Sequence, residues 1–355
     1  MTRARVLFAE VPCFYAAIEC SQHPELRGRP VIVGGDPRKR GLVQAASPDA
    51  LEAGVALDMP LVEALRLCPR ARAVRTDMAL YRDLSRQLLA CLRRVFAQLE
   101  PFGLAAAYFA VPVSPDPEVS ARLLAERVRQ ELGLPLRVGI ASAKFVARVA
   151  AEEAGAEGVL SVAEGAEREF LRPLGVERLD GVGRKTAAAL AELGAVTIGE
   201  VQRLGRERLE EVFGTHGLRI FSFASALDDS PVRASRHPQS LSRELTLPGE
   251  VLDRAVIGEQ LLELARQLEG ELARQGLAAG RVGVKVRFVD QGTQSRSRAL
   301  SELVVAAGDL HAVALGLLDR TEVGSRRIRG LGLQLGKLAA AAEADRQLDL
   351  FFGGR

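Results

Sequence analysis

The segment Leu104–Val111 most limits what this chain can fold into, because it is apolar throughout and carries no charge. Pro101 and Pro112 lie close to its two ends, and prolines commonly mark the limits of a strand. A strand that is apolar on both faces is typical of a sheet that is covered on both sides. We therefore expect a central strand at 104–111 inside a covered sheet.

Short strands and amphipathic helices alternate on either side of this segment. The pattern predicts strands at 6–9, 31–35, 42–45 and 136–141, and helices at 80–98, 115–132 and 143–153. Alternation of this kind is typical of an α/β sheet domain, and about 165 residues is an ordinary domain size. We therefore expect one α/β domain over residues 1–165.

From Phe170 the pattern changes to short helices. Gly181 and Gly183 precede a predicted helix, as in a helix-hairpin-helix motif. Backbone N–H groups at a helix N-terminus bind phosphate well. Arg184 and Lys185 in the first turn favour contact with a DNA backbone over a plain glycine-rich turn between helices.

A second α/β unit is predicted after the polar linker at 227–239. It has a helix at 251–275 and a strand at 281–289, in which apolar and basic residues alternate. This alternation places Arg281, Lys285 and Arg287 on one face of the strand. Arg296 and Arg298 continue the basic character beyond it. The pattern favours contacts with a phosphate backbone over a solvated sheet face.

The last segment, 339–355, is predicted to be a flexible tail that starts with small residues. Its apolar side chains have no core to join, which favours a linear motif that docks on another protein over a turn packed on its own domain. The motif consists of Gln347, Leu348, Asp349, Leu350 and Phe351.

Cysteine spacing and hydropathy exclude several classes of protein. The four cysteines form no CxxC pair and have no histidine at metal-ligand spacing, so we expect no zinc site and a reducing compartment. No segment is apolar enough for a signal peptide or a membrane span. We therefore expect a cytoplasmic protein with no membrane partner.

Taken together, these segments resemble the Y-family (translesion) DNA polymerases of the DNA polymerase IV and UmuC-like type. The resemblance covers nearly the whole chain and is carried by 13–19 (CFYAAIE), 56–69 (ALDMPLVEALRLCP), 144–148 (KFVAR), 181–183 (GVG) and the tail motif. It implies an α/β (α+β multidomain) fold with the family's right-hand architecture. The implied domains are palm and fingers at 1–165 (fingers about 20–78), thumb at 166–230, little finger at 231–338 and tail at 339–355.

The resemblance also implies a catalytic site, and this chain departs from it. Polymerases of this kind hold two Mg²⁺ ions with clustered carboxylates. The positions of these carboxylates fall on Glu10, Pro12, Ala105 and Ala106, of which only Glu10 is acidic. One carboxylate cannot hold two Mg²⁺ ions. Tyr15 falls where the family has its steric gate against ribonucleotides.

The residues that grip the triphosphate are missing as well. The family has a Tyr, an Arg and a Lys at the positions that fall on Pro48, Leu51 and Gly155. A shift in the alignment with the family explains poorly why ligand residues are missing at several separate positions of one site, because the flanking residues match those of the family. We therefore expect no cofactor.

The leading hypothesis is a non-catalytic homologue of the ImuB type. It would bind primer–template DNA, bind the β sliding clamp through its tail, and bring other factors, such as a replicative or error-prone polymerase, to damaged DNA. The alternative is an active translesion polymerase that uses Mg²⁺ with relocated ligands such as Glu100 or Asp116. A third hypothesis, a DNA-binding module without a clamp role, is disfavoured by the tail motif.

Overall fold

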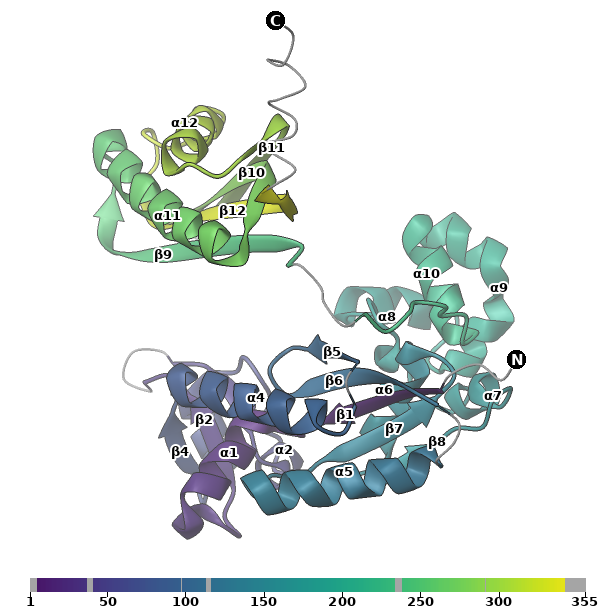
Figure 1. Cartoon of the computed structure of the whole chain (residues 1–355). Helices are drawn as coiled ribbons and strands as arrows, with labels where there is room; N and C mark the ends of the chain where they lie inside the picture. Colours follow the sequence, from purple (N-terminus) through teal and green to yellow (C-terminus); the bar gives the residue numbers. More distant parts are fainter. Residues whose placement is uncertain are drawn as a thin grey trace, which may run out of the picture. The chain divides into compact units, whose positions relative to one another are not determined.

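The computed structural model divides the chain into two compact units, Met1–Ala234 and Ser235–Arg355 (Figure 1). The structure describes residues 5–36, 41–96, 98–112, 116–233, 238–290 and 292–341. The predicted tail motif at 347–351 lies outside these residues. The predicted domain boundaries at 165, 230 and 338 stay predictions.

The centre of the first unit is a five-stranded sheet in the order β5-β6-β1-β7-β8. Its strands are β1 (Arg5–Glu10), β5 (Leu99–Phe102), β6 (Ala106–Val111), β7 (Arg137–Ala141) and β8 (Val159–Ser161). β1 is antiparallel to both β6 and β7, and β7 is parallel to β8.

The predicted central strand is present but shorter, because 103–105 form a turn between β5 and β6. The sequence did not predict β5, since it contains Pro101. β5 lies at the edge of the sheet, where a missing N–H group is tolerated.

Helices cover both faces of this sheet, as expected for uncharged strands. On one face, Leu7 and Phe109 pack with α1 (Phe14–Gln22), α4 (Met78–Arg93) and α5 (Pro117–Leu132). On the other face, Phe8 and Tyr108 pack with α6 (Lys144–Glu153) and with residues from the helical segment that follows. The side chains of β6 from Ala106 to Phe109 are buried.

A smaller sheet in the order β3-β2-β4 has its own core. It consists of β2 (Val31–Gly34), β3 (Val43–Ala46) and β4 (Arg72–Arg75), with the helical segments η1 (Pro24–Leu26), α2 (Pro48–Glu52) and α3 (Leu61–Leu67). The predicted strands at 31–35 and 42–45 are present as β2 and β3, which pair in antiparallel fashion. The parallel pairing of β4 with β2 was not predicted.

The segment after β8 is helical, as predicted. It contains α7 (Glu167–Leu171), η3 (Val176–Arg178), α8 (Arg184–Glu192), α9 (Ile198–Phe213) and α10 (Thr215–Ala224). A capping box starts α9: the Thr197 hydroxyl accepts from the Glu200 N–H, and the Glu200 carboxylate accepts from the Thr197 N–H.

The second unit is an antiparallel sheet in the order β11-β10-β12-β9 with two helices. The elements are β9 (Ser240–Val251), α11 (Arg254–Gln275), β10 (Leu277–Phe288), β11 (Thr293–Val304), α12 (Ala307–Leu318) and β12 (Ile328–Ala340). The helices α11 and α12 lie on one face and form a core with the buried valines of β10 (Figure 1). Among the described residues of the chain, no helix has the length and hydropathy needed to cross a membrane.

Candidate functional site

The four positions of the family's carboxylates come together at the end of β1. The β1–β6 register places Glu10 opposite Ala106, and the Val11 N–H donates to the Ala105 carbonyl at 2.9 Å. Pro12 follows directly. We call Glu10, Pro12, Ala105 and Ala106 the remnant site. The remnant site lies where the end of β1 meets the start of β6, and Glu10 is its one charged residue.

The remaining carboxylate is held by a cation. Arg137 lies opposite Glu10 on β7, and its Nε donates to Glu10 Oε2 at 2.8 Å. The sequence did not reveal this partner. The part of the chain that the structure describes contains no group of three or more His, Cys, Asp or Glu residues able to hold a metal ion. The residues of the remnant site therefore do not fit a pair of Mg²⁺ ions.

The two alternative ligands are engaged elsewhere. Glu100 lies within β5, the neighbour of β6 in the sheet. Its buried carboxylate accepts from Lys144 Nζ at 2.7 Å and from the Arg233 N–H at 2.8 Å. Asp116 caps α5 by accepting from the Glu118 N–H at 2.9 Å. Neither carboxylate is directed at the remnant site by these contacts.

An apolar pocket of about 570 Å³ adjoins the remnant site. It is lined by Cys13, Phe14, Tyr15, Gln44, Ala45, Ala46, Leu51, Leu57, Gly103, Leu104 and Ala105, none of which is charged. Leu51, which falls at the family's arginine position, and Leu57 are more than one-third exposed. This lining cannot neutralise a triphosphate.

Tyr15, at the steric-gate position, packs against a second tyrosine. Its ring stacks on the Tyr81 ring with centroids 4.3 Å apart and an interplanar angle of 11°. The buried Tyr81 O–H donates to the buried Glu19 carboxylate at 2.5 Å. Burial, followed by this hydrogen bond, raises the pKa of Tyr81, so the hydroxyl stays protonated at neutral pH.

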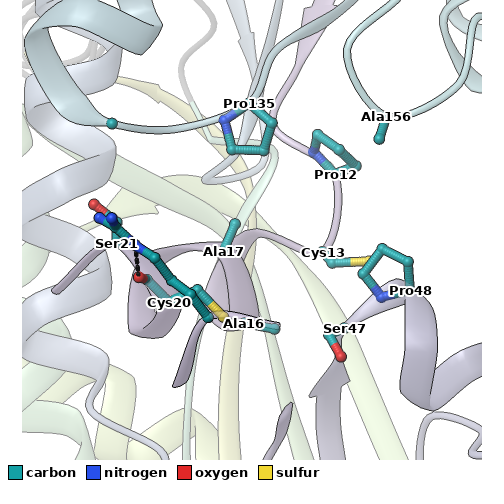
Figure 2. A pocket seen from close by; sticks show the side chains of 12 residues that line it. Pro12, Cys13, Ala16, Ala17, Cys20, Ser21, Ser47, Pro48, Pro135 and Ala156 are labelled. Atoms are coloured by element: carbon teal, nitrogen blue, oxygen red, sulfur yellow. Dashed lines mark hydrogen bonds between the residues drawn. The ribbon is translucent and has the colours of Figure 1, made fainter. Parts of the chain in front are cut away.

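A second, smaller pocket of about 270 Å³ lies on the other side of Cys13. Figure 2 shows Pro12, Cys13, Pro48 and Ala156 around it. Gly155, at the family's lysine position, precedes Ala156 and contributes no side chain. Burial raises the pKa of the Cys13 thiol, which stays protonated and uncharged. Arg27 lines this pocket, but Pro48 and Gly155, at the positions of the family's Tyr and Lys, provide neither a hydroxyl group nor a charge.

The predicted glycine-containing hairpin, Gly181–Gly183 followed by α8, is present. Gly181 has φ +87°, and a Cβ added to it would lie 2.9 Å from a ring carbon of His216. Gly183 is the N-cap of α8, so no N-cap side chain accepts from the first N–H groups of this helix. Arg184 and Lys185 in its first turn are exposed. Backbone donors and two cations thus share one helix N-terminus.

An ion-pair network ties this hairpin to α6. Arg148 of α6 donates to the Asp180 carboxylate at 2.6 Å and to the Arg178 carbonyl at 3.3 Å. Arg178 in turn donates to Glu152 at 2.9 Å. This network could not be predicted from the sequence, because its members lie about thirty residues apart.

The open face of the second sheet carries the predicted basic stripe. Arg281 and Lys285 are exposed and Arg287 is half-buried, whereas Val282, Val284 and Val286 between them are buried. On the same face, β12 contributes Gly330, Gly332 and Gly336 opposite these basic residues. The side chains of Arg287 and Glu244 lie over Gly330 and Gly332, at 2.7 and 2.9 Å from where a Cβ would stand.

Part of the stripe's charge is already paired. Lys285 Nζ forms an ion pair with Glu244 at 2.9 Å, and Arg287 donates to the Thr246 hydroxyl at 3.1 Å. Exposed pairs of this kind are weak, so a phosphate can compete for the same cations.

Arg296 and Arg298 do not join this stripe. The β10–β11 register pairs them with Val284 and Val282, the residues that face the core. They therefore lie on the opposite side of the sheet, along its edge strand, and they are exposed there. They continue the basic character of the segment but on the other face, because each strand directs successive side chains to opposite faces.

Comparisons with known proteins match both units. The model of the impB/mucB/samB family matches residues 10–152, and the model of the C-terminal domain of that family matches 238–350. A protein named DNA polymerase IV from Alkalilimnicola ehrlichii is 33% identical over 99% of this chain and 100% of its own length. A protein of the same name from Dehalococcoides mccartyi is 32% identical over 94% of this chain and 87% of its own length.

Solved structures of Y-family DNA polymerases have the same fold. A chimera of the polymerases Dbh and Dpo4 superposes with a TM-score of 0.81 at 22% identity, covering 95% of this chain and 99% of that chain. An insertion ternary complex of Dbh polymerase gives 0.71 at 23% identity, covering 94% and 98%. The expected fold is confirmed, and the chain belongs to the impB/mucB/samB family of Y-family DNA polymerases.

Proposed function

We propose that this chain is a non-catalytic Y-family member that binds primer–template DNA during translesion synthesis and brings other proteins to it. The observation that carries this proposal is the remnant site, where Pro12, Ala105 and Ala106 replace carboxylates and Arg137 neutralises Glu10. A transferring phosphoryl group needs metal ions to balance its developing charge. This site has no means of holding them.

DNA binding is supported by two separate surfaces. The hairpin offers uncapped N–H groups with Arg184 and Lys185, and the open sheet face of the second unit offers Arg281, Lys285 and Arg287. Neither surface has a base-reading pattern of side chains, so we expect binding that is sequence-independent and sensitive to salt.

We further propose that the tail motif at 347–351 docks on the β sliding clamp. The apolar side chains of Leu348, Leu350 and Phe351 are spaced as anchors of a short linear motif. Deleting Gln347–Phe351 should abolish binding to purified clamp and leave DNA affinity unchanged. Clamp binding that survives the deletion would contradict this assignment.

An active polymerase is the second candidate function. It is favoured by the relatives named DNA polymerase IV, which match this chain along nearly its whole length. It would require metal ligands other than those of the remnant site, and Glu100 and Asp116 both have partners of their own.

Primer extension with excess protein in Mg²⁺, and then in Mn²⁺, decides between the two. A Glu10→Ala variant purified in parallel controls for a contaminating polymerase. We expect no extension from folded, DNA-binding protein. Extension by the wild type that Glu10→Ala abolishes would establish an active site and overturn the proposal.

A further inference from the structure

His216, in the first turn of α10, packs against the glycine-containing hairpin. A Cβ built on Gly181 would lie 2.9 Å from Cε1 of the ring, 3.8 Å from Nδ1 and 3.9 Å from Nε2. The ring therefore directs the edge that carries both nitrogens at the backbone of Gly181. This contact joins the start of α10 to the loop that precedes α8, although the two residues are 35 positions apart in the sequence.

The ring nitrogens of His216 have no partner inside the protein. Within the ranges that the structure describes, His216 makes no hydrogen bond and no ion pair. In contrast, His23 Nδ1 lies 3.3 Å from Glu25, and His311 Nε2 lies 3.0 Å from the Gly258 carbonyl. His216 is half-buried, so part of its surface remains open to solvent. The donors of this ring are therefore available to a ligand.

The surroundings of the ring carry an excess of positive charge. The charged side chains on the loop, the first turn of α8, the last turn of α9 and on α10 are Asp180, Arg184, Lys185, Glu210, Glu211 and Arg219. Two of the three carboxylates, those of Asp180 and Glu211, are already paired with arginines. None of the three cations forms a salt bridge within the described part of the chain. Such a surface attracts an anion.

We propose that His216, in its protonated form, is a third cationic contact between this hairpin and the DNA backbone, beside Arg184 and Lys185. The inference rests on the proposed function, because the hairpin is one of the two surfaces to which that function assigns DNA binding. A neutral imidazole has one donor, whereas the protonated ring has two donors and a charge.

The contact makes DNA binding depend on pH. Histidine gains its charge between about pH 8 and pH 5. A bound phosphate favours the charged form of the ring, whereas the neighbouring cations disfavour it in the free protein. DNA binding is therefore coupled to the uptake of a proton by His216, and the grip on DNA is stronger at acidic pH.

The test measures the affinity of the full chain for labelled primer–template DNA by fluorescence anisotropy, over a range of salt concentrations at pH 6 and at pH 8. His216→Gln removes the titrating group, and His216→Lys carries a charge at both pH values. His23→Gln is the matched control, because it removes an exposed histidine just after α1. Thermal melting checks that the variants are folded at both pH values.

Each phosphate neutralised on duplex DNA contributes about 0.9 to the slope of log K against log salt concentration. We expect the wild-type slope to be steeper at pH 6 than at pH 8 by nearly that amount. Between about 50 and 200 mM salt, the wild type should then lose about 3-fold more affinity at pH 6 than at pH 8. His216→Gln should show the shallower slope at both pH values, and His216→Lys the steeper one. The His23→Gln control should keep the wild-type difference.

Three results would overturn the inference while the proposed function stands. The first is an equal wild-type slope at pH 6 and pH 8, and the second is a pH difference that persists in His216→Gln. The third is a loss of affinity in His216→Gln that is the same at both pH values, which would assign the ring to packing on Gly181. A wild type that binds primer–template DNA at neither pH would overturn the proposed function itself, and this inference with it.

Discussion

The charge of single residues decides how the remnant site responds to metal. Clustered carboxylates repel one another and are relieved by a bound cation, but Glu10 here is balanced by Arg137. We expect millimolar Mg²⁺ to leave the melting temperature unchanged relative to EDTA, as measured by scanning fluorimetry. A rise that Glu10→Ala removes would contradict the dead-site interpretation.

The variant Pro12→Asp/Ala105→Asp/Ala106→Glu supplies the positive control for this measurement. It restores four acidic residues at one place, so it should melt below the wild type in EDTA and recover stability in Mg²⁺. If the restored variant shows no metal response either, the backbone of this site no longer has the shape that two ions require.

Gly181 permits a second test at a single position. Because its φ is +87°, a left-handed conformation, Gly181→Ala should lower the free energy of unfolding by about 1–2 kcal/mol. The contact with His216 should add to this loss and weaken DNA binding. Gly183→Ala is the control, since Gly183 has φ −89° and open space around its Cβ position. Equal urea midpoints for the two variants would contradict the strain argument.

Single residues also show what a sequence can and cannot reveal. The loss of carboxylates at Ala105 and Ala106 was predictable, because the flanking residue Tyr108 and the segment 13–19 resemble the family and fix the alignment. Arg137 was not, since it is separated from Glu10 by 127 residues and only the β1–β7 pairing brings them together. Two residues that meet only because their strands pair leave no local pattern in the sequence.

Between β5 and α6, the buried pair Glu100–Lys144 supports the fold rather than catalysis. The two side chains are 3% and 7% exposed, and removing one leaves the other charged and buried. We expect Glu100→Leu or Lys144→Met alone to cost about 3–5 kcal/mol in urea unfolding. The double variant buries no charge and should lose less than either single variant, although the Arg233 N–H loses its acceptor. Additive losses would contradict this.

Glu167, at the start of α7, makes the stability of the fold depend on pH. Burial alone would raise the pKa of Glu167, but hydrogen bonds from the Ser142 hydroxyl at 2.5 Å and from backbone N–H groups outweigh it and lower the pKa. A carboxylate whose pKa is lower in the folded than in the unfolded protein stabilises the fold at pH values above its unfolded-state pKa of about 4.3. This stabilisation is lost as the pH falls through the folded-state pKa.

Lowering the pH from neutral to about 4 should therefore reduce the melting temperature of the wild type more than that of Glu167→Gln. Glu169→Gln, at an exposed neighbouring position, is the control and should follow the wild type. Circular dichroism melts at both pH values provide the measurement. Parallel curves for wild type and Glu167→Gln would show that this carboxylate does not contribute.

Elements with a strong period were predictable, whereas the edge strands β4 and β5 were not. The buried valines of β10 follow from alternation, and β2 follows from its apolar run Val31–Val33. β4 and β5 were missed because an edge strand buries few side chains and can hold arginines or a proline. The face on which Arg296 and Arg298 lie could not be predicted either, because it depends on the register between β10 and β11, which a single sequence does not contain.

At the scale of the whole molecule, the two units have separate cores, and each carries a predicted DNA-binding surface. We expect residues 1–234 and 238–355, produced separately, each to unfold cooperatively and to bind primer–template DNA weakly.

The intact chain should bind far more tightly than either piece, because covalent linkage raises the effective concentration of the second surface to the millimolar range. Mixing the two pieces at micromolar concentration should not reproduce that affinity. If it does, or if one unit alone accounts for the affinity of the whole chain, only one of the two surfaces holds the DNA. The hairpin and the basic stripe would then have to be tested one at a time.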